Sequence, residues 1–218
     1  MRLELHPKNP EVRLMKKVLE AFAAGEVVIY PTDSGYSMGC DALSKKGVHK
    51  LYHLKRAMKK YLMALMVRDF GALSEFAKVE TSSFRYMKAV VPGPYTFILP
   101  ATVRSRKLLD VNRPEVGVRM PDCPFTNTLF RLNPEAVILT TAAKIQEEDS
   151  FIDPADIEEN YGHLVDLIVD MGPLPVTPTT VISLLGEAAE IIREGAGPIP
   201  GSGSRSNAPG PNLRLPGR

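Results

Sequence analysis

One short stretch limits what this chain can fold into: the apolar run Val27-Val28-Ile29-Tyr30 and the polar segment that follows it. The run is rich in β-branched and aromatic residues, which predicts a buried strand that stops at Pro31, because proline cannot donate to a strand ladder. Residues 31–40 are then expected to form a loop with three hydroxyls, one carboxylate and the glycines Gly35 and Gly39. A loop at this place either binds a small polar ligand or is an ordinary capped turn.

The composition predicts one soluble cytoplasmic domain. A chain of 218 residues with 44% hydrophobic content can bury one sizeable core. Its net charge of only +2 means that affinity for nucleic acid would need a local basic patch. Cys40 and Cys123 have neither metal-binding spacing nor a disulfide framework, and the sequence shows no signal peptide or membrane span. We expect a domain over residues 1–197 and a Gly-, Pro- and Ser-rich tail without its own fold over residues 198–218.

Hydrophobic periodicity by itself predicts a mixture of helices and strands. Asn9 and Pro10 mark the start of a first helix, with Asn9 as its N-cap. Further helices are expected at residues 44–57, 71–77, 82–90, 124–132 and 154–161. Further strands are expected at residues 3–6, 62–67, 95–99, 116–119, 136–139, 164–169 and 178–183. Residues 102–112 are expected to form an exposed connection.

The segment 45–60 is basic and contains no acidic residue. Lys45 and Lys46 would lie in the first turn of a helix, where the helix dipole disfavours cations. The segment is either a solvated face or a surface that meets an anionic ligand or RNA. The candidate RNA contacts are Lys45, Lys46, Lys50, Arg56, Lys59 and Lys60.

Several motifs, in order along the chain, resemble one family. Pro31-Thr32-Asp33-Ser34-Gly35-Tyr36 is similar to the Pro-Thr-Glu-Thr-Val-Tyr loop of the YrdC-like family, and closer to the Pro-Thr-Asp-Ser-Gly-Tyr variant of its YciO branch. The resemblance continues in Pro-Gly-Pro at 92–94, Val-Gly-Val-Arg at 116–119, Thr-Thr-Val-Ile at 179–182 and Ile-x-Arg-x-Gly at 191–195. Ordered matches are more specific than any single motif. They imply an α/β fold, with a twisted mixed sheet, surrounding helices and a large concave basic cavity.

The characterised members of this family are threonylcarbamoyl-AMP synthases of the tRNA t6A modification pathway. The resemblance therefore implies an enzyme that uses threonine, bicarbonate and ATP with Mg²⁺, and that acts by positioning, without a covalent nucleophile. The residues that it implicates in threonine binding are Thr32, Ser34, Arg119 and Thr179. Those that it implicates in nucleotide binding are Lys55, Thr140, Thr141 and Arg193. A guanidinium suits a carboxylate ligand, although Arg119 could instead form a salt bridge with Asp33 or Asp122.

Two positions depart from the family pattern, both on the nucleotide side. Ala57 stands where the family has the arginine of a Lys-x-Arg pair, and Ala142 where it has the asparagine of a Ser-x-Asn motif. A methyl group cannot replace an amide as hydrogen-bond partner or ligand. Three interpretations remain open: a weak or altered synthase, a protein that binds modified tRNA or double-stranded RNA and hydrolyses its threonylcarbamoyl adenosine, and an RNA-binding or nucleotide-sensing module without catalysis.

Overall fold

Helices and strands are mixed along the chain, as the periodicity predicts. The computed structural model describes residues 1–56, 63–109, 113–145 and 151–199. The strands are β1 (Arg2–Glu4), β2 (Val28–Thr32), β3 (Gly35–Asp41), β4 (Ala64–Met66), β5 (Tyr95–Pro100), β6 (Glu115–Arg119), β7 (Ile138–Ala142), β8 (Leu167–Asp170), β9 (Thr180–Ser183) and β10 (Glu190–Arg193). The helices are α1 (Val12–Ala23), α2 (Lys45–Lys55), α3 (Phe70–Ser74), α4 (Thr81–Lys88), α5 (Val103–Leu109), α6 (Pro124–Leu132) and α7 (Pro154–Tyr161).

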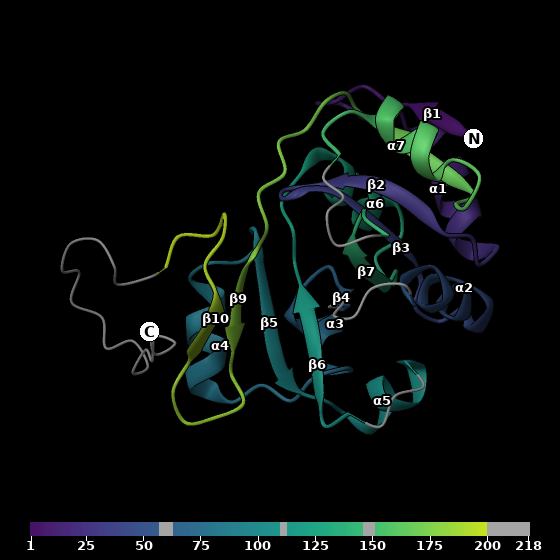
Figure 1. Ribbon diagram of the computed structural model, residues 1–218. Coiled ribbons are helices and arrows are strands. Elements are labelled where there is room, and N and C mark those ends of the chain that lie inside the picture. Colours follow the sequence, from purple (N-terminus) through teal and green to yellow (C-terminus); the bar gives the residue numbers. More distant parts are fainter. Residues whose placement is uncertain (57–62, 110–112, 146–150, 200–218) are drawn as a thin grey trace.

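Within the described ranges, ten strands form one mixed sheet in the order β1-β8-β2-β3-β7-β4-β6-β5-β9-β10 (Figure 1). Strands β1, β8 and β2 run parallel, and β2 and β3 form an antiparallel hairpin. Strand β7 pairs antiparallel with β3 and β4, and parallel and antiparallel pairs alternate from β4 to β10. The predicted α/β class with a mixed sheet is confirmed.

The pairing register places two different rows of residues on the two faces of the sheet, because successive residues of a strand point to opposite faces. One row is apolar and buried, and consists of Cys40, Leu139, Leu65, Val118, Phe97 and Ile182. The adjacent row points to the other face, and consists of Gly39, Thr140, Ala64, Gly117, Ile98 and Ser183. We call the second the site face. The side chains of its row are mostly small or polar, and a cavity of about 180 Å³ borders Ile98 and Gly117.

Two cores hold the sheet in place. At the β1-β8-β2 end, α1 and α6 pack around Tyr30, whose ring stacks on Phe125 at a centroid distance of 5.4 Å and meets Phe22 edge-on at 5.9 Å. The face opposite the site face carries the larger core. Helices α2, α3, α4 and α7 contribute to it the buried side chains of Leu51, Leu73, Met87 and Ile157.

The expectation that the first strand stops at Pro31 and that a loop follows is wrong. Strand β2 continues to Thr32, and β3 begins at Gly35, so the predicted loop is a hairpin with Asp33 and Ser34 at its turn. Proline is tolerated because β8 pairs with β2 only at Val28 and Ile29, so the outer side of β2 at Pro31 has no ladder partner among the described residues. Gly35 has a positive φ of 102°, which the turn requires and which a side chain would strain.

Two helix predictions also need correction. Helix α1 has Glu11 as its N-cap rather than Asn9, because His6 accepts hydrogen bonds from the backbone N–H groups of Lys8 and Asn9 and holds these residues in a separate turn. Residues 103–109 form α5 rather than a connection, with Leu109 on its buried side. Side-chain hydrogen bonds of Ser44, Asp69 and Asp153 cap the N-termini of α2, α3 and α7.

Some predictions lie outside the described residues. They concern Ala57, Lys59, Lys60 and nearly all of the expected tail. In the described part of the chain, no helix has the length and apolar character needed to cross a membrane.

Candidate functional site

A buried ion pair lies at one end of the site face. Arg119 is the last residue of β6, and its Nη2 donates to Asp33 Oδ1 at 2.8 Å and to Ser34 Oγ at 2.9 Å. The relative exposures of the Arg119 and Asp33 side chains are 8% and 9%. Of the two salt bridges considered as alternatives for Arg119, the one with Asp33 is thus formed. Arg119 Nε is buried and has no hydrogen-bond partner among the residues that the structure describes.

The second carboxylate oxygen of Asp33 is held by the segment between β6 and α6. Asp33 Oδ2 accepts a hydrogen bond from the backbone N–H of Asp122 at 3.0 Å. Burial raises the pKa of Asp33, while the charge of Arg119 and the Asp122 N–H act in the opposite direction. Thr32 Oγ1 donates to Gly35 O at 2.7 Å and lies 3.2 Å from Ser34 Oγ. The structure therefore brings together three of the predicted threonine contacts, Thr32, Ser34 and Arg119.

The fourth predicted threonine contact, Thr179, lies on the β9 side. Its Oγ1 is 2.9 Å from Thr96 Oγ1. Arg193 donates to Thr179 O from Nε at 3.1 Å and from Nη2 at 2.9 Å. Burial lowers the pKa of Arg193, and the charge of Arg119 adds to this effect. Arg119 thus forms its ion pair with Asp33, whereas no carboxylate of the described residues forms an ion pair with Arg193. This excess of positive charge favours an anionic ligand.

The predicted nucleotide contacts are less uniform. Lys55 is fully buried, and its Nζ donates to the backbone oxygens of Ala142, at 2.8 Å, and Lys144. Lys55 thus anchors the end of α2 to the segment that follows β7. Thr140 lies on the site face, where its Oγ1 accepts from Tyr30 at 2.6 Å. Thr141 pairs with Met38 and, one residue on from Thr140, points to the opposite face.

Two lysines of the basic helix α2 have hydrogen-bond partners within the protein. Lys50 Nζ forms an ion pair with Asp166 at 2.6 Å, and Lys46 Nζ donates to Ala24 O at 3.2 Å. Asp166 also accepts from the backbone N–H of Val27. Among the described RNA candidates, Lys45, Lys46 and Arg56 are exposed, and their contact with RNA stays a prediction.

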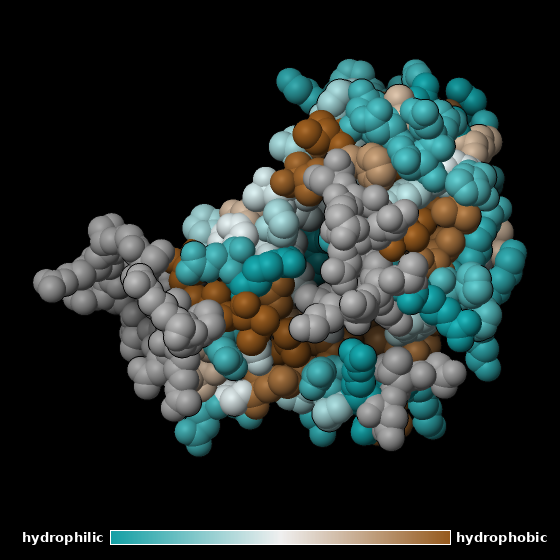
Figure 2. Space-filling model, viewed as in Figure 1, coloured by the Kyte–Doolittle hydropathy of each residue, from teal (hydrophilic) through white to brown (hydrophobic). Residues whose placement is uncertain are grey.

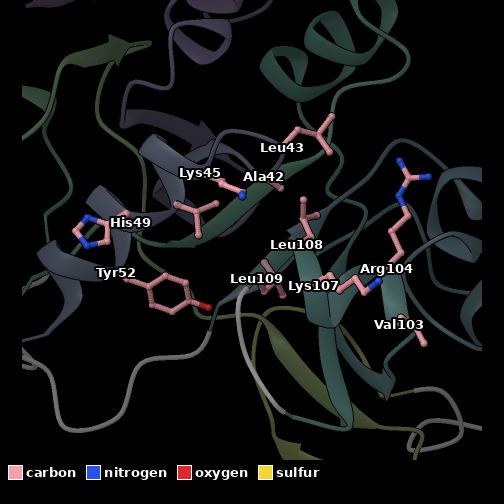
Figure 3. A pocket seen from close by; sticks show the side chains of 11 residues that line it. Ala42, Leu43, Lys45, His49, Tyr52, Val103, Arg104, Lys107, Leu108 and Leu109 are labelled. Carbon is pink, nitrogen blue, oxygen red and sulfur yellow. The ribbon is translucent and has the colours of Figure 1, made fainter.

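A second cavity, of about 1030 Å³, opens between α2 and α5 (Figure 3). Lys45, His49 and Tyr52 border it from α2, and Lys107 and Leu108 from α5. None of the described residues that border it is acidic. Sequence reasoning missed the α5 side, because residues 102–112 were expected to be a connection; the helical spacing of Arg104 and Lys107 is the signal that could have shown it.

The hydropathy of the molecular surface differs between the two sides of the site. Figure 2 shows the model from the side seen in Figure 1. Hydrophobic residues gather over the β9 side of this hollowed surface, and hydrophilic residues over α7 and α2. Sequence reasoning missed the roles of Thr96 and Tyr30, which contact the predicted residues Thr179 and Thr140.

Fold and site together define a class of α/β protein in which arginines and hydroxyls gather on the less covered face of a mixed sheet. Residues 20–195 match the model of the Sua5/YciO/YrdC family, whose description is "telomere recombination". The chain belongs to this family, which confirms the resemblance seen in the motifs.

Among the relatives is the protein YciO of Escherichia coli K12, described as uncharacterized, with 35% identity over 89% of this chain and 95% of that protein. A threonylcarbamoyl-AMP synthase of Vibrio vulnificus is 30% identical over 53% of this chain and 63% of that protein. The crystal structure of E. coli YciO is similar with a TM-score of 0.82 and 34% identity, covering 91% of this chain and 97% of that one. P. abyssi Sua5 complexed with L-threonine shares the fold, with a TM-score of 0.80 and 22% identity over 89% of this chain and 57% of that one.

Proposed function

We propose that this protein binds L-threonine through Arg119 and forms threonylcarbamoyl-AMP from threonine, bicarbonate and MgATP. The observation that carries the proposal is the buried Arg119 guanidinium, whose Nε has no hydrogen-bond partner among the described residues while Nη2 is held by Asp33 and Ser34. A buried, unpartnered donor on a charged group is costly, and a ligand carboxylate would satisfy it. The threonine complex of P. abyssi Sua5 and the name of the V. vulnificus relative support this choice of ligand.

In this reaction the protein acts by position and charge. The threonine nitrogen attacks bicarbonate, water leaves, and an oxygen of the resulting carbamate attacks the α-phosphorus of ATP, which releases pyrophosphate. Arg119, with the hydroxyls of Thr32 and Ser34, orients the threonine, and Arg193 on the β9 side offsets negative charge on the phosphates. Mg²⁺ arrives with ATP, and no group of three or more His, Cys, Asp or Glu residues in the described ranges is arranged to hold a metal.

The alanine at position 142, where the family has an asparagine, predicts slow turnover. A gain-of-function variant tests this prediction. Ala142 ends β7 with an exposed methyl group on the site face, beside the backbone oxygens that hold Lys55. We expect Ala142→Asn to raise threonine-dependent release of pyrophosphate from ATP by about tenfold or more, because a single preorganised polar contact can contribute this much. Ala142→Leu is the size-matched control and should not raise turnover. Pyrophosphate release that does not depend on threonine, in the wild type and in both variants, would contradict the proposal.

The cavity between α2 and α5 favours a second candidate function, in which the threonylcarbamoyl group comes from a modified RNA and is hydrolysed. Lys45, His49 and Lys107 border the same cavity as Tyr52, a combination suited to phosphates and a stacked base.

Reversing two of these charges distinguishes this candidate. We expect the double variant Lys45→Glu with Lys107→Glu to bind RNA about tenfold or more weakly at low salt, because each substitution removes a contact between a lysine and a phosphate. The loss of these contacts should also reduce the salt dependence of binding. The matched control is Lys16→Glu with Lys17→Glu on the exposed side of α1. Binding would be measured by fluorescence anisotropy with a labelled tRNA. Equal losses in the two double variants would show that only the overall charge matters, and would exclude the cavity as the RNA site.

A further inference from the structure

Asp33 is a fixed negative charge beside the guanidinium that we assign to the ligand carboxylate. One of its oxygens accepts from Arg119 Nη2 at 2.8 Å, and the other from the backbone N–H of Asp122 at 3.0 Å. The two donors come from opposite sides, one from β6 and one from the segment before α6. Because both oxygens are held, Asp33 is not free to swing away when a ligand approaches.

A ligand carboxylate that accepts a hydrogen bond from Arg119 Nε would bind the same guanidinium as Asp33 does. Two like charges so close together in a buried site repel each other strongly, because little water is present to screen them. Arg193 does not remove this repulsion at the hairpin, since its N–H groups donate to Thr179 on the β9 side. The repulsion is offset when the ligand itself carries a cation next to its carboxylate. An α-amino acid does so, because its ammonium nitrogen and its carboxylate are attached to the same carbon.

We propose that Asp33 is a specificity-determining residue: it receives the α-ammonium group of a free amino acid and rejects carboxylates that lack one. The inference rests on the proposed function, because it deepens the assignment of Arg119 to a ligand carboxylate. Each oxygen of Asp33 has a second lone pair, so it can accept from an ammonium group while it keeps its present partners. The pair Arg119 and Asp33 is then complementary to a zwitterion, with opposite charges 2.8 Å apart.

The test compares two ligands that differ only in the amino group: L-threonine and (R)-3-hydroxybutyrate, which has the same chain and hydroxyl. Isothermal titration calorimetry on the wild type is expected to give at least about tenfold tighter binding of L-threonine, equivalent to roughly 1.4 kcal/mol. In Asp33→Asn the preference should fall to within about threefold, because threonine loses a partner while 3-hydroxybutyrate loses a repelling charge. Asp122→Asn is the matched control, since its exposed side chain contacts Asn127 and not the ion pair.

The outcomes separate this inference from the proposed function. If neither ligand binds the wild type, both are overturned. If L-threonine binds but the wild type does not prefer it over 3-hydroxybutyrate, only the role of Asp33 is overturned, and this result needs no variant. The same holds if Asp33→Asn, shown to be folded by its near-UV circular dichroism, weakens both ligands equally.

Discussion

Replacing Arg119 with alanine is expected to abolish threonine binding and to lower the free energy of unfolding by about 3–5 kcal/mol, the usual effect of removing one partner of a buried ion pair. The substitution leaves Asp33 without its cation in a site where its side chain is only 9% exposed. It also removes the hydrogen bond to Ser34, which holds the turn of the β2–β3 hairpin against β6. Urea unfolding and calorimetric titration with L-threonine measure the two effects separately.

A double variant distinguishes stability from binding. Arg119→Ala combined with Asp33→Asn removes both charges, so we expect it to recover most of the lost stability and none of the threonine binding. Arg119→Lys keeps a positive charge but not the planar fork of donors, and should fold with clearly weaker binding. Wild-type affinity for threonine in folded Arg119→Ala would show that the carboxylate binds elsewhere.

Gly195→Ala is expected to disrupt the β9 side of the site. A Cβ at this position would lie 2.1 Å from Pro178 O and 2.5 Å from the carbonyl carbon of Thr179, and these backbone atoms cannot turn aside. The segment at Gly195 must then move away from the segment at residues 178–180. This movement strains the hydrogen bond from the Gly195 N–H to Thr180 Oγ1 and the contacts of Arg193 with Thr179. We expect a loss of about 1–3 kcal/mol in the free energy of unfolding, typical of overpacking, and about tenfold weaker threonine binding.

Gly186→Ala provides the matched control for this substitution. Gly186 lies in the turn between β9 and β10, and the nearest atom to a Cβ there is Ala188 O at 3.9 Å, an ordinary contact distance. Its stability should therefore change by no more than about 0.5 kcal/mol, as for most surface substitutions. Equal effects of the two alanines, measured by thermal unfolding and calorimetric titration, would contradict the role given to Gly195.

Local patterns predicted well those features that depend on local physics. Asp153 and Pro154 start α7 as expected, because an N-cap and a proline at the first helical position act within one turn. The same reasoning failed at Pro31, where the tolerance of a proline depends on how far β8 extends along β2. It also failed for residues 103–109, whose helix is stabilised by burial of Leu109 under distant elements.

The sequence by itself determined the class of fold, the family and the kinds of side chain available for binding, because periodicity and ordered motifs are properties of the chain. Only the tertiary structure decided which of them meet. Arg119 and Asp33 are 86 positions apart and become partners through the order of the strands. Strand register placed Thr140 on the site face and Thr141 on the other, and the packing of α2 assigned Lys55 to backbone carbonyls. Such contacts depend on the relative placement of whole elements, which no local pattern encodes.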